Sequence, residues 1–139
     1  MQYASQCNEL PTRQQFCRWA KAALQRDLQC TLRVVDESEG RKLNHDFRGK
    51  DYATNVLTFV YDETVSLSGD IVICAPIVAR ESAAQGKQLD AHFAHLTVHS
   101  MLHLQGYDHE NMVDAAEMEA LETALMAKLG YPAPYEVNT

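Results

Sequence analysis

The sequence predicts a mixed fold of helices and strands, of the α/β or α+β class. One segment carries apolar residues at the spacing of a helix, four further segments end at a glycine as helices do, and three short segments are rich in β-branched or alternating apolar residues. One of the three, IVICA at residues 71–75, is apolar throughout. A strand of this kind is usually buried on both faces, so we expect a small sheet with helices on either side of it.

The expected helices are set by apolar periodicity and by the residues that stop them. Leu10-Pro11-Thr12 reads as a helix start, and Trp19 falls on the apolar stripe that follows, which predicts a core position. Glycines follow the other four segments and favour helix ends. The five expected helices span residues 12–26, 38–47, 76–85, 89–105 and 112–129.

The expected strands lie between these helices. TLRVV at residues 31–35 alternates and is β-branched, and NVLTFVY at residues 55–61 is similar. The apolar segment 71–75 follows Gly69-Asp70 and is the third strand. Strands interleaved with helices favour one compact α/β or α+β domain.

Length and composition predict a single cytoplasmic domain over residues 1–139. The 139 residues suffice for one core, and 46% apolar with 22% charged residues is ordinary globular composition. No apolar run approaches the roughly 18–20 residues of a membrane span, and the first residues lack the pattern of a secretory signal. The four cysteines are scattered without a CxxC pair, which indicates reduced thiols. We therefore expect no membrane partner.

The charge is unevenly distributed. A net charge of −7 argues against nonspecific nucleic-acid binding, and no DNA partner is expected. Residues 41–50 nevertheless hold four bases against one acid, namely Arg41, Lys42, Arg48 and Lys50. A phosphate-bearing partner would have to approach this segment, and a solvated surface is the alternative explanation.

The segment HSMLHLQGYDH, residues 99–109, holds three of the six histidines. His99 and His103 are at i and i+4 of the expected helix 89–105, so both imidazoles can reach one metal ion. Gly106 can turn the chain sharply, which lets His109 offer a third nitrogen. Three nitrogen ligands with an open fourth position are typical of catalytic zinc, which lowers the pKa of a bound water to roughly 7. His95 shares this face, and we favour a packing or substrate-side role for it.

The same spacing occurs in the metzincin proteases, where a glutamate follows the first histidine and acts as the general base. This chain has Ser100 at that position. A serine is a very poor base at neutral pH, so the pattern predicts a metal centre with a chemistry other than peptide hydrolysis.

Three blocks of the sequence resemble the YbeY family of bacterial rRNA-maturation endoribonucleases. His99 to His109 is similar to the family signature H-G-x-L-H-L-x-G-Y-D-H, with Ser100 in place of the usual glycine. Residues 48–59, R-G-K-D-Y-A-T-N-V-L-T-F, resemble R-x-K-D-x-x-T-N-V-L-S-F, and residues 69–73 resemble G-D-I-x-I. Val60 departs from the proline that is common after the Phe. The resemblance covers about residues 32–135.

The resemblance implies a mixed four-stranded sheet with about five surrounding helices and one zinc ion per chain. It implies that His99, His103 and His109 hold the zinc and that Arg48 is the functional arginine. It further implies a single-strand-specific endoribonuclease that acts on rRNA, notably in maturation of the 16S rRNA 3′ end, and in ribosome quality control. The expected partners are then single-stranded RNA, rRNA and ribosomal particles.

Within this interpretation, the planar guanidinium of Arg48 suits a phosphate in the transition state. His99 counts both as a metal ligand and as a catalytic residue. Lys50, Arg41 and Lys42 are possible RNA contacts. Asp108 can orient a ligand histidine, or it can be a turn residue. Two alternatives stay open: a zinc hydrolase of another class, such as a metzincin-like protease without its glutamate, and a ribosome-associated factor with a structural zinc.

Overall fold

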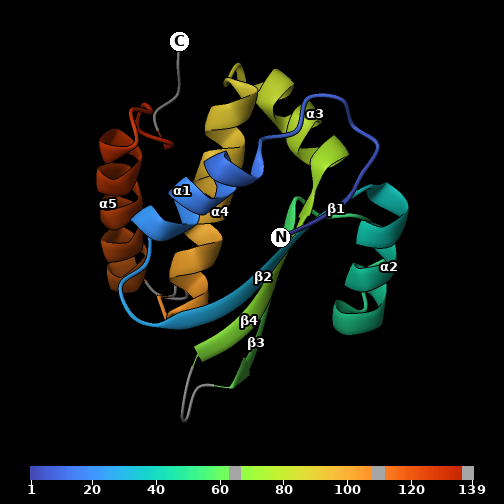
Figure 1. Cartoon of the computed structure of the whole chain (residues 1–139), viewed down its shortest axis with the longest axis horizontal. Coiled ribbons are helices and arrows are strands. Elements are labelled where there is room, and N and C mark those ends of the chain that lie inside the picture. Colours follow the sequence, from blue (N-terminus) through green and yellow to red (C-terminus); the bar gives the residue numbers. More distant parts are fainter. Residues whose placement is uncertain (63–66, 108–111, 136–139) are drawn as a thin grey trace.

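The computed structural model describes residues 1–62, 67–107 and 112–135, and Figure 1 shows the whole arrangement. Four strands and five helices occur in this part of the chain. The strands are β1 (Gln2–Ala4), β2 (Leu28–Val35), β3 (Val56–Asp62) and β4 (Leu67–Cys74). The helices are α1 (Arg13–Ala22), α2 (Glu37–Arg48), α3 (Ala75–Gln85), α4 (Leu89–Leu104) and α5 (Met112–Lys128).

The strands form one mixed sheet in the order β1-β2-β4-β3. β2 runs parallel to both of its neighbours, β1 and β4, whereas β3 pairs antiparallel with β4. The expected mixed four-stranded sheet with five helices is confirmed. β3 lies at one edge of the sheet, which leaves one side of this strand available to the functional site.

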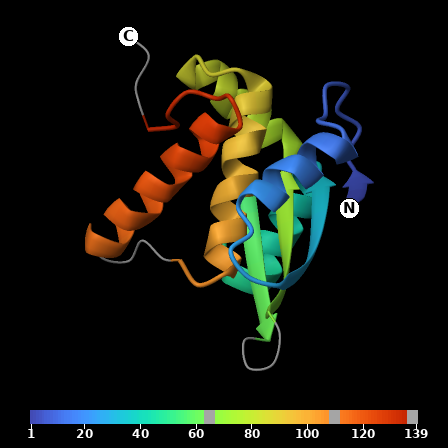
Figure 2. The same cartoon turned by 60° about the vertical axis from the view of Figure 1, so that its left-hand side comes forward.

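Helices cover both faces of the sheet (Figures 1 and 2). α1 and α4 lie against one face, α5 packs on α4, and α2 lies on the other face. The larger core cluster joins α1, α4 and α5 to β2 and β4, and it contains Trp19, which is buried as expected. The smaller cluster, Val35, Leu57, Val72 and Cys74, lies on the α2 side. The strand at residues 71–75 is buried throughout, as its apolar run predicted.

Local chemistry determines where several helices begin and end. The Thr12 hydroxyl accepts a hydrogen bond from the Gln15 amide at 3.1 Å, and the Gln15 side chain accepts one from the Thr12 amide at 2.9 Å. This capping box begins α1. α2 ends at its C-terminus with Gly49, which has φ of 68°. This left-handed conformation favours glycine and ends the helix directly after Arg48. The turn therefore positions Arg48 at a helix terminus.

A close approach between β4 and α4 sets the position of the histidine helix. A Cβ atom on Gly69 would lie 2.5 Å from the Phe59 carbonyl oxygen and 2.8 Å from Leu104 Cδ2. Only a residue without a side chain allows β3, β4 and the last turn of α4 to come this close. His103 and the edge strand are thereby held near each other.

The expected elements agree with the structure apart from their ends and one strand. The strand β1 was not expected, because three residues are too few to show a period. It forms because its backbone pairs with residues 33–35 of β2. None of the helices in residues 1–62, 67–107 and 112–135 is long and apolar enough to cross a lipid bilayer.

Candidate metal centre

Helix α4 carries three histidines on one side at intervals of four residues. His95, His99 and His103 follow each other by one turn, and the ring centroids of His95 and His99 are 6.1 Å apart. All three side chains are partly buried. The shared face of His99 and His103 that the i and i+4 spacing predicted is therefore formed by a regular helix.

A buried carboxylate on α5 joins two of these histidines. Glu122 is 0% exposed, and it accepts hydrogen bonds from His99 Nδ1, from His95 Nε2 at 3.1 Å and from the Tyr135 hydroxyl. Burial alone would raise the pKa of Glu122, but the three hydrogen bonds outweigh it and lower the pKa to about 2. Glu122 is therefore an ionised acceptor at neutral pH.

This contact decides which nitrogen of His99 carries the hydrogen. An ionised carboxylate can only accept, so the hydrogen of the neutral ring lies on Nδ1 and the lone pair lies on Nε2. A carboxylate behind a histidine is a common way to orient a metal ligand. Burial, followed by the neighbouring Glu122, raises the pKa of Tyr135, so its hydroxyl stays a donor.

His99 and His103 line a pocket of about 590 Å³ together with residues from two other elements. Phe47 and Arg48 reach it from the end of α2, and Thr58 and Phe59 reach it from the edge strand β3. Arg48 is exposed and makes no ion pair or hydrogen bond with any residue that the structure describes. The pocket thus combines imidazoles with an uncompensated guanidinium.

The donor set fits a transition metal. Buried nitrogens are normally hydrogen-bonded, yet His103 Nδ1 is buried and unpartnered within the described part of the chain. Imidazole nitrogens suit zinc and similar ions. In addition, single ligand atoms of His95, His99 and Glu122 lie within 4.8 Å of one another, so this group could also hold a metal ion.

The other expected site residues are distributed as follows. His109 and Asp108 lie outside the described residues. Arg41 is paired with Asp51 at 2.9 Å and lines a different pocket with Glu37 and Arg80. Lys42 and Lys50 are exposed and do not line the pocket of His99 and His103. Of the four bases of the segment 41–50, Arg48 is the one that reaches this pocket.

Glu122 and Tyr135 were not expected from the sequence. A signal for Glu122 was nevertheless present. Met118 and Leu125 of α5, and Leu129 directly after it, form a buried stripe at helical spacing, and Glu122 lies within that stripe. A carboxylate on an apolar stripe must find buried hydrogen-bond donors, which here are the histidines of α4.

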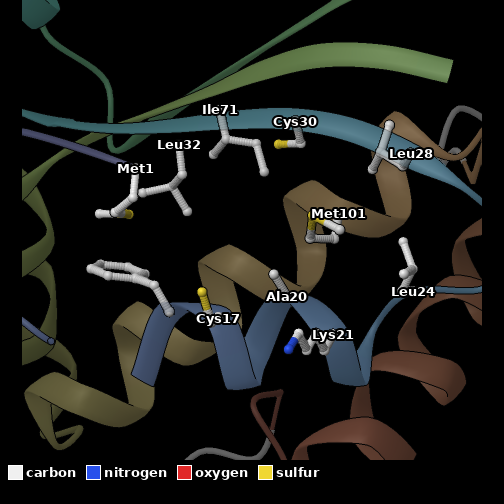
Figure 3. A pocket seen from close by; sticks show the side chains of 11 residues that line it. Met1, Cys17, Ala20, Lys21, Leu24, Leu28, Cys30, Leu32, Ile71 and Met101 are labelled. Carbon is white, nitrogen blue, oxygen red and sulfur yellow. The ribbon is translucent and has the colours of Figure 1, made fainter. Parts of the chain in front are cut away.

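A second, mainly apolar pocket of about 240 Å³ lies between α1 and the sheet (Figure 3). Figure 3 shows Cys17 and Ala20 of α1 facing Leu32 and Ile71 of the strands. Burial, and then Asp70, raise the pKa of the Cys30 thiol at its wall to about 11. A protonated thiol is a poor nucleophile, so the pocket with the histidines is the better candidate for chemistry.

Known proteins resemble this chain over most of its length. The family model described as endoribonuclease YbeY matches residues 4–130. An endoribonuclease YbeY from Aromatoleum aromaticum is 65% identical over 125 residues, which cover 90% of this chain and 81% of that protein. Another from Methylobacillus flagellatus is 58% identical over 135 residues, which cover 97% and 91%.

Among solved structures, the solution structure of TM1509 from Thermotoga maritima has a TM-score of 0.56 and 24% identity, and the match covers 89% of this chain and 88% of that one. At this identity the likeness concerns the fold alone. The family match spans nearly the whole chain, from the last residue of β1 to Gly130 after α5, and includes every element of the pocket. The chain therefore belongs to the YbeY family of endoribonucleases.

Proposed function

We propose that the protein is a zinc-dependent endoribonuclease that cleaves single-stranded RNA in the cytoplasm. Its substrate is rRNA within ribosomal particles, with maturation of the 16S rRNA 3′ end and ribosome quality control as its roles. The observation that carries the proposal is one pocket shared by Arg48, His99 and His103. Membership of a family whose relatives are named endoribonucleases supports the reaction class.

In the proposed centre, His99 and His103 hold the metal with His109, which lies outside the described residues. Zinc supplies Lewis-acid chemistry towards a phosphodiester when it is bound. Glu122 keeps the hydrogen of His99 on Nδ1, which would leave the lone pair of Nε2 for the metal. We assign Glu122 to this orienting role because it is fully buried and already accepts three hydrogen bonds.

Arg48 is proposed to bind the phosphate whose ester bond breaks. The transition state of phosphodiester hydrolysis gains negative charge on the phosphoryl oxygens, and a paired set of N–H donors stabilises that charge. Because Arg48 has no carboxylate partner in the described part of the chain, its guanidinium is available to the substrate. Asp108 remains a proposed partner of a ligand histidine, and Lys42, Lys50 and Arg41 remain proposed outer contacts.

The experiment is incubation of the zinc-loaded protein with an unstructured oligoribonucleotide, followed by analysis of the product ends. A 2′,3′-cyclic phosphate means attack by the 2′-hydroxyl, and a 5′-phosphate means attack by water. H99A and H103A should abolish cleavage, whereas H45A, which removes an exposed histidine of α2, should cleave like the wild type. Cleavage that persists in both variants, or a metal-loaded wild type without cleavage, contradicts the proposal.

The protease alternative has one specific observation in its favour. Residues 56–59 of the edge strand β3 line the pocket beside the histidine helix, and an edge strand can bind an extended peptide. Against it, Ser100 is fully buried and offers a hydroxyl where a protease needs a carboxylate. An unstructured peptide added to the same assay should remain intact. If the pure protein loaded with zinc folds but hydrolyses neither polymer, the third interpretation, a structural zinc, is favoured.

A further inference from the structure

The ring of Phe47 is the most exposed large apolar side chain in the described part of the chain, at 66%. Phe47 belongs to neither core cluster. Among the described residues, the one aromatic ring that contacts Phe47 is that of Phe59 on β3. The ring centroids are 5.2 Å apart and the ring planes are at 66° to each other. Phe47 therefore leans on Phe59 and keeps most of its surface exposed.

Single exposed apolar residues are common, and exposure by itself indicates nothing. The position of Phe47 is what matters here. Phe47 and Phe59 both line the pocket of His99 and His103, and Phe47 is the chain neighbour of Arg48. The wall of the candidate nuclease site thus presents an aromatic surface and a cation side by side, both at the end of α2.

We propose that Phe47, held against Phe59, is a stacking platform for one unpaired base of the RNA, next to a phosphate bound by Arg48. This inference rests on the proposed function and adds to it the basis of single-strand selection. A base can stack on a protein ring only when it is splayed out of its own helix, because the bases of a duplex already stack on each other. Double-stranded RNA would then lack the contact.

The chemistry of the neighbours favours a base over an apolar peptide side chain. A nucleotide carries an aromatic face and a phosphate on one unit, which matches the adjacent phenyl and guanidinium groups. Arg48 has no acidic partner among the described residues, so its exposed guanidinium is available to a ligand that brings its own anion. An apolar peptide side chain supplies no such charge.

The test compares four variants of the zinc-loaded full chain on an unstructured fluorescent oligoribonucleotide. Stacking on one side chain is worth about 5- to 150-fold in affinity, so F47A should lose at least about five-fold in kcat/KM. F47L keeps apolar bulk against Phe59 without a π face and should lose as much, whereas F47W should retain activity. Y52A is the matched control, because Tyr52 is 57% exposed and lines a different pocket.

A second measurement locates the base. The oligonucleotide is prepared with one abasic ribonucleotide at each position in turn. In the wild type, the abasic nucleotide at one position should lower kcat/KM by the same factor as the F47A substitution does. In F47A, the same abasic nucleotide should not lower kcat/KM further. This non-additivity is the signature of a direct contact between the two groups. Thermal melting and zinc content of each variant exclude loss of the fold or of the metal.

The outcomes separate this inference from the proposed function. If the wild type cleaves RNA and F47A and F47L are as active as Y52A, the platform is wrong and the nuclease stands. If the wild type neither binds nor cleaves RNA, the proposed function fails first. If F47A weakens binding of an unstructured peptide and leaves RNA unaffected, the pocket wall serves a protein ligand and the inference is overturned.

Discussion

Glu122 of α5 accepts a hydrogen bond from Nδ1 of His99 on α4, although 23 residues separate them in the chain. The carboxylate is fully buried and ionised, and it also binds His95 and Tyr135. Because this arrangement fixes the hydrogen of a proposed metal ligand, α5 contributes to the site without lining its pocket.

E122Q should weaken zinc binding by about 10- to 100-fold, because an amide oxygen is a poorer acceptor and its NH₂ group opposes one of the donors. Competition with a chromophoric chelator measures the affinity directly. E117Q is the matched control, since Glu117 is an exposed carboxylate of the same helix. Equal zinc affinity in E122Q and E117Q would show that Glu122 does not orient His99.

R48A should lower RNA cleavage by about 2–4 kcal/mol of activation free energy, the usual effect of removing one electrostatic donor. Its zinc content and melting temperature should not change, because Arg48 is exposed and unpaired among the described residues. R48K should recover little of the cleavage rate that R48A loses, since an ammonium lacks the paired donors of a guanidinium. R80A, which removes an arginine that lines another pocket, should cleave normally. A wild-type rate in R48A contradicts the phosphate role.

Binding of single-stranded RNA should weaken as salt rises, even though the protein is net negative at −7. Each phosphate contacted contributes a slope of about −0.7 to log K against log salt, so one to four contacts predict roughly −1 to −3. R48A should reduce the slope by about 0.7. Fluorescence anisotropy over a range of potassium chloride concentrations measures this, and a slope of zero in the wild type would exclude phosphate contacts.

G69A should destabilise the protein by about 1–3 kcal/mol, because the new methyl group would overlap the Phe59 carbonyl and Leu104. The carbonyl belongs to the paired strand β3 and cannot move aside without loss of the sheet. Urea denaturation measures the free energy of unfolding. Gln29 is an exposed residue of the neighbouring strand β2, so Q29A is the control and should change the free energy of unfolding little. Equal stability of the two variants would mean that α4 can shift outward.

The metal-free protein should lose stability as the pH falls below about 6.5, the ordinary pKa of histidine. His92 is 5% exposed, and burial lowers its pKa more than the Glu81 carboxylate raises it. The unfolded chain then binds the proton at a higher pH than the folded chain, so unfolding becomes easier by up to about 1.4 kcal/mol per pH unit. H92Q should show a smaller loss between pH 7 and 5, whereas H45Q, at an exposed position, should behave like the wild type.

The sequence by itself determined the helices, the main strands and the shared face of His99 and His103. These features depend on local interactions: a period of 3.6 residues, β-branched segments, and glycines such as Gly49 and Gly106, which adopt positive φ at helix ends. The family motifs also lie within short continuous segments, so the reaction class could be recognised before any contact between segments was known.

The tertiary structure decided which side chains meet. Glu122 is buried because α5 packs on α4, and Arg48 lines the pocket because α2 ends beside the edge strand. Arg41 belongs to the same basic segment but turns to Asp51 instead. Such contacts join residues that are far apart in the chain, and their energies depend on burial and on the charge of neighbours from other elements. The apolar stripe around Glu122 indicates that this carboxylate is buried, but no local pattern names the histidines that it meets. The contact with His99 is therefore visible only in the folded protein.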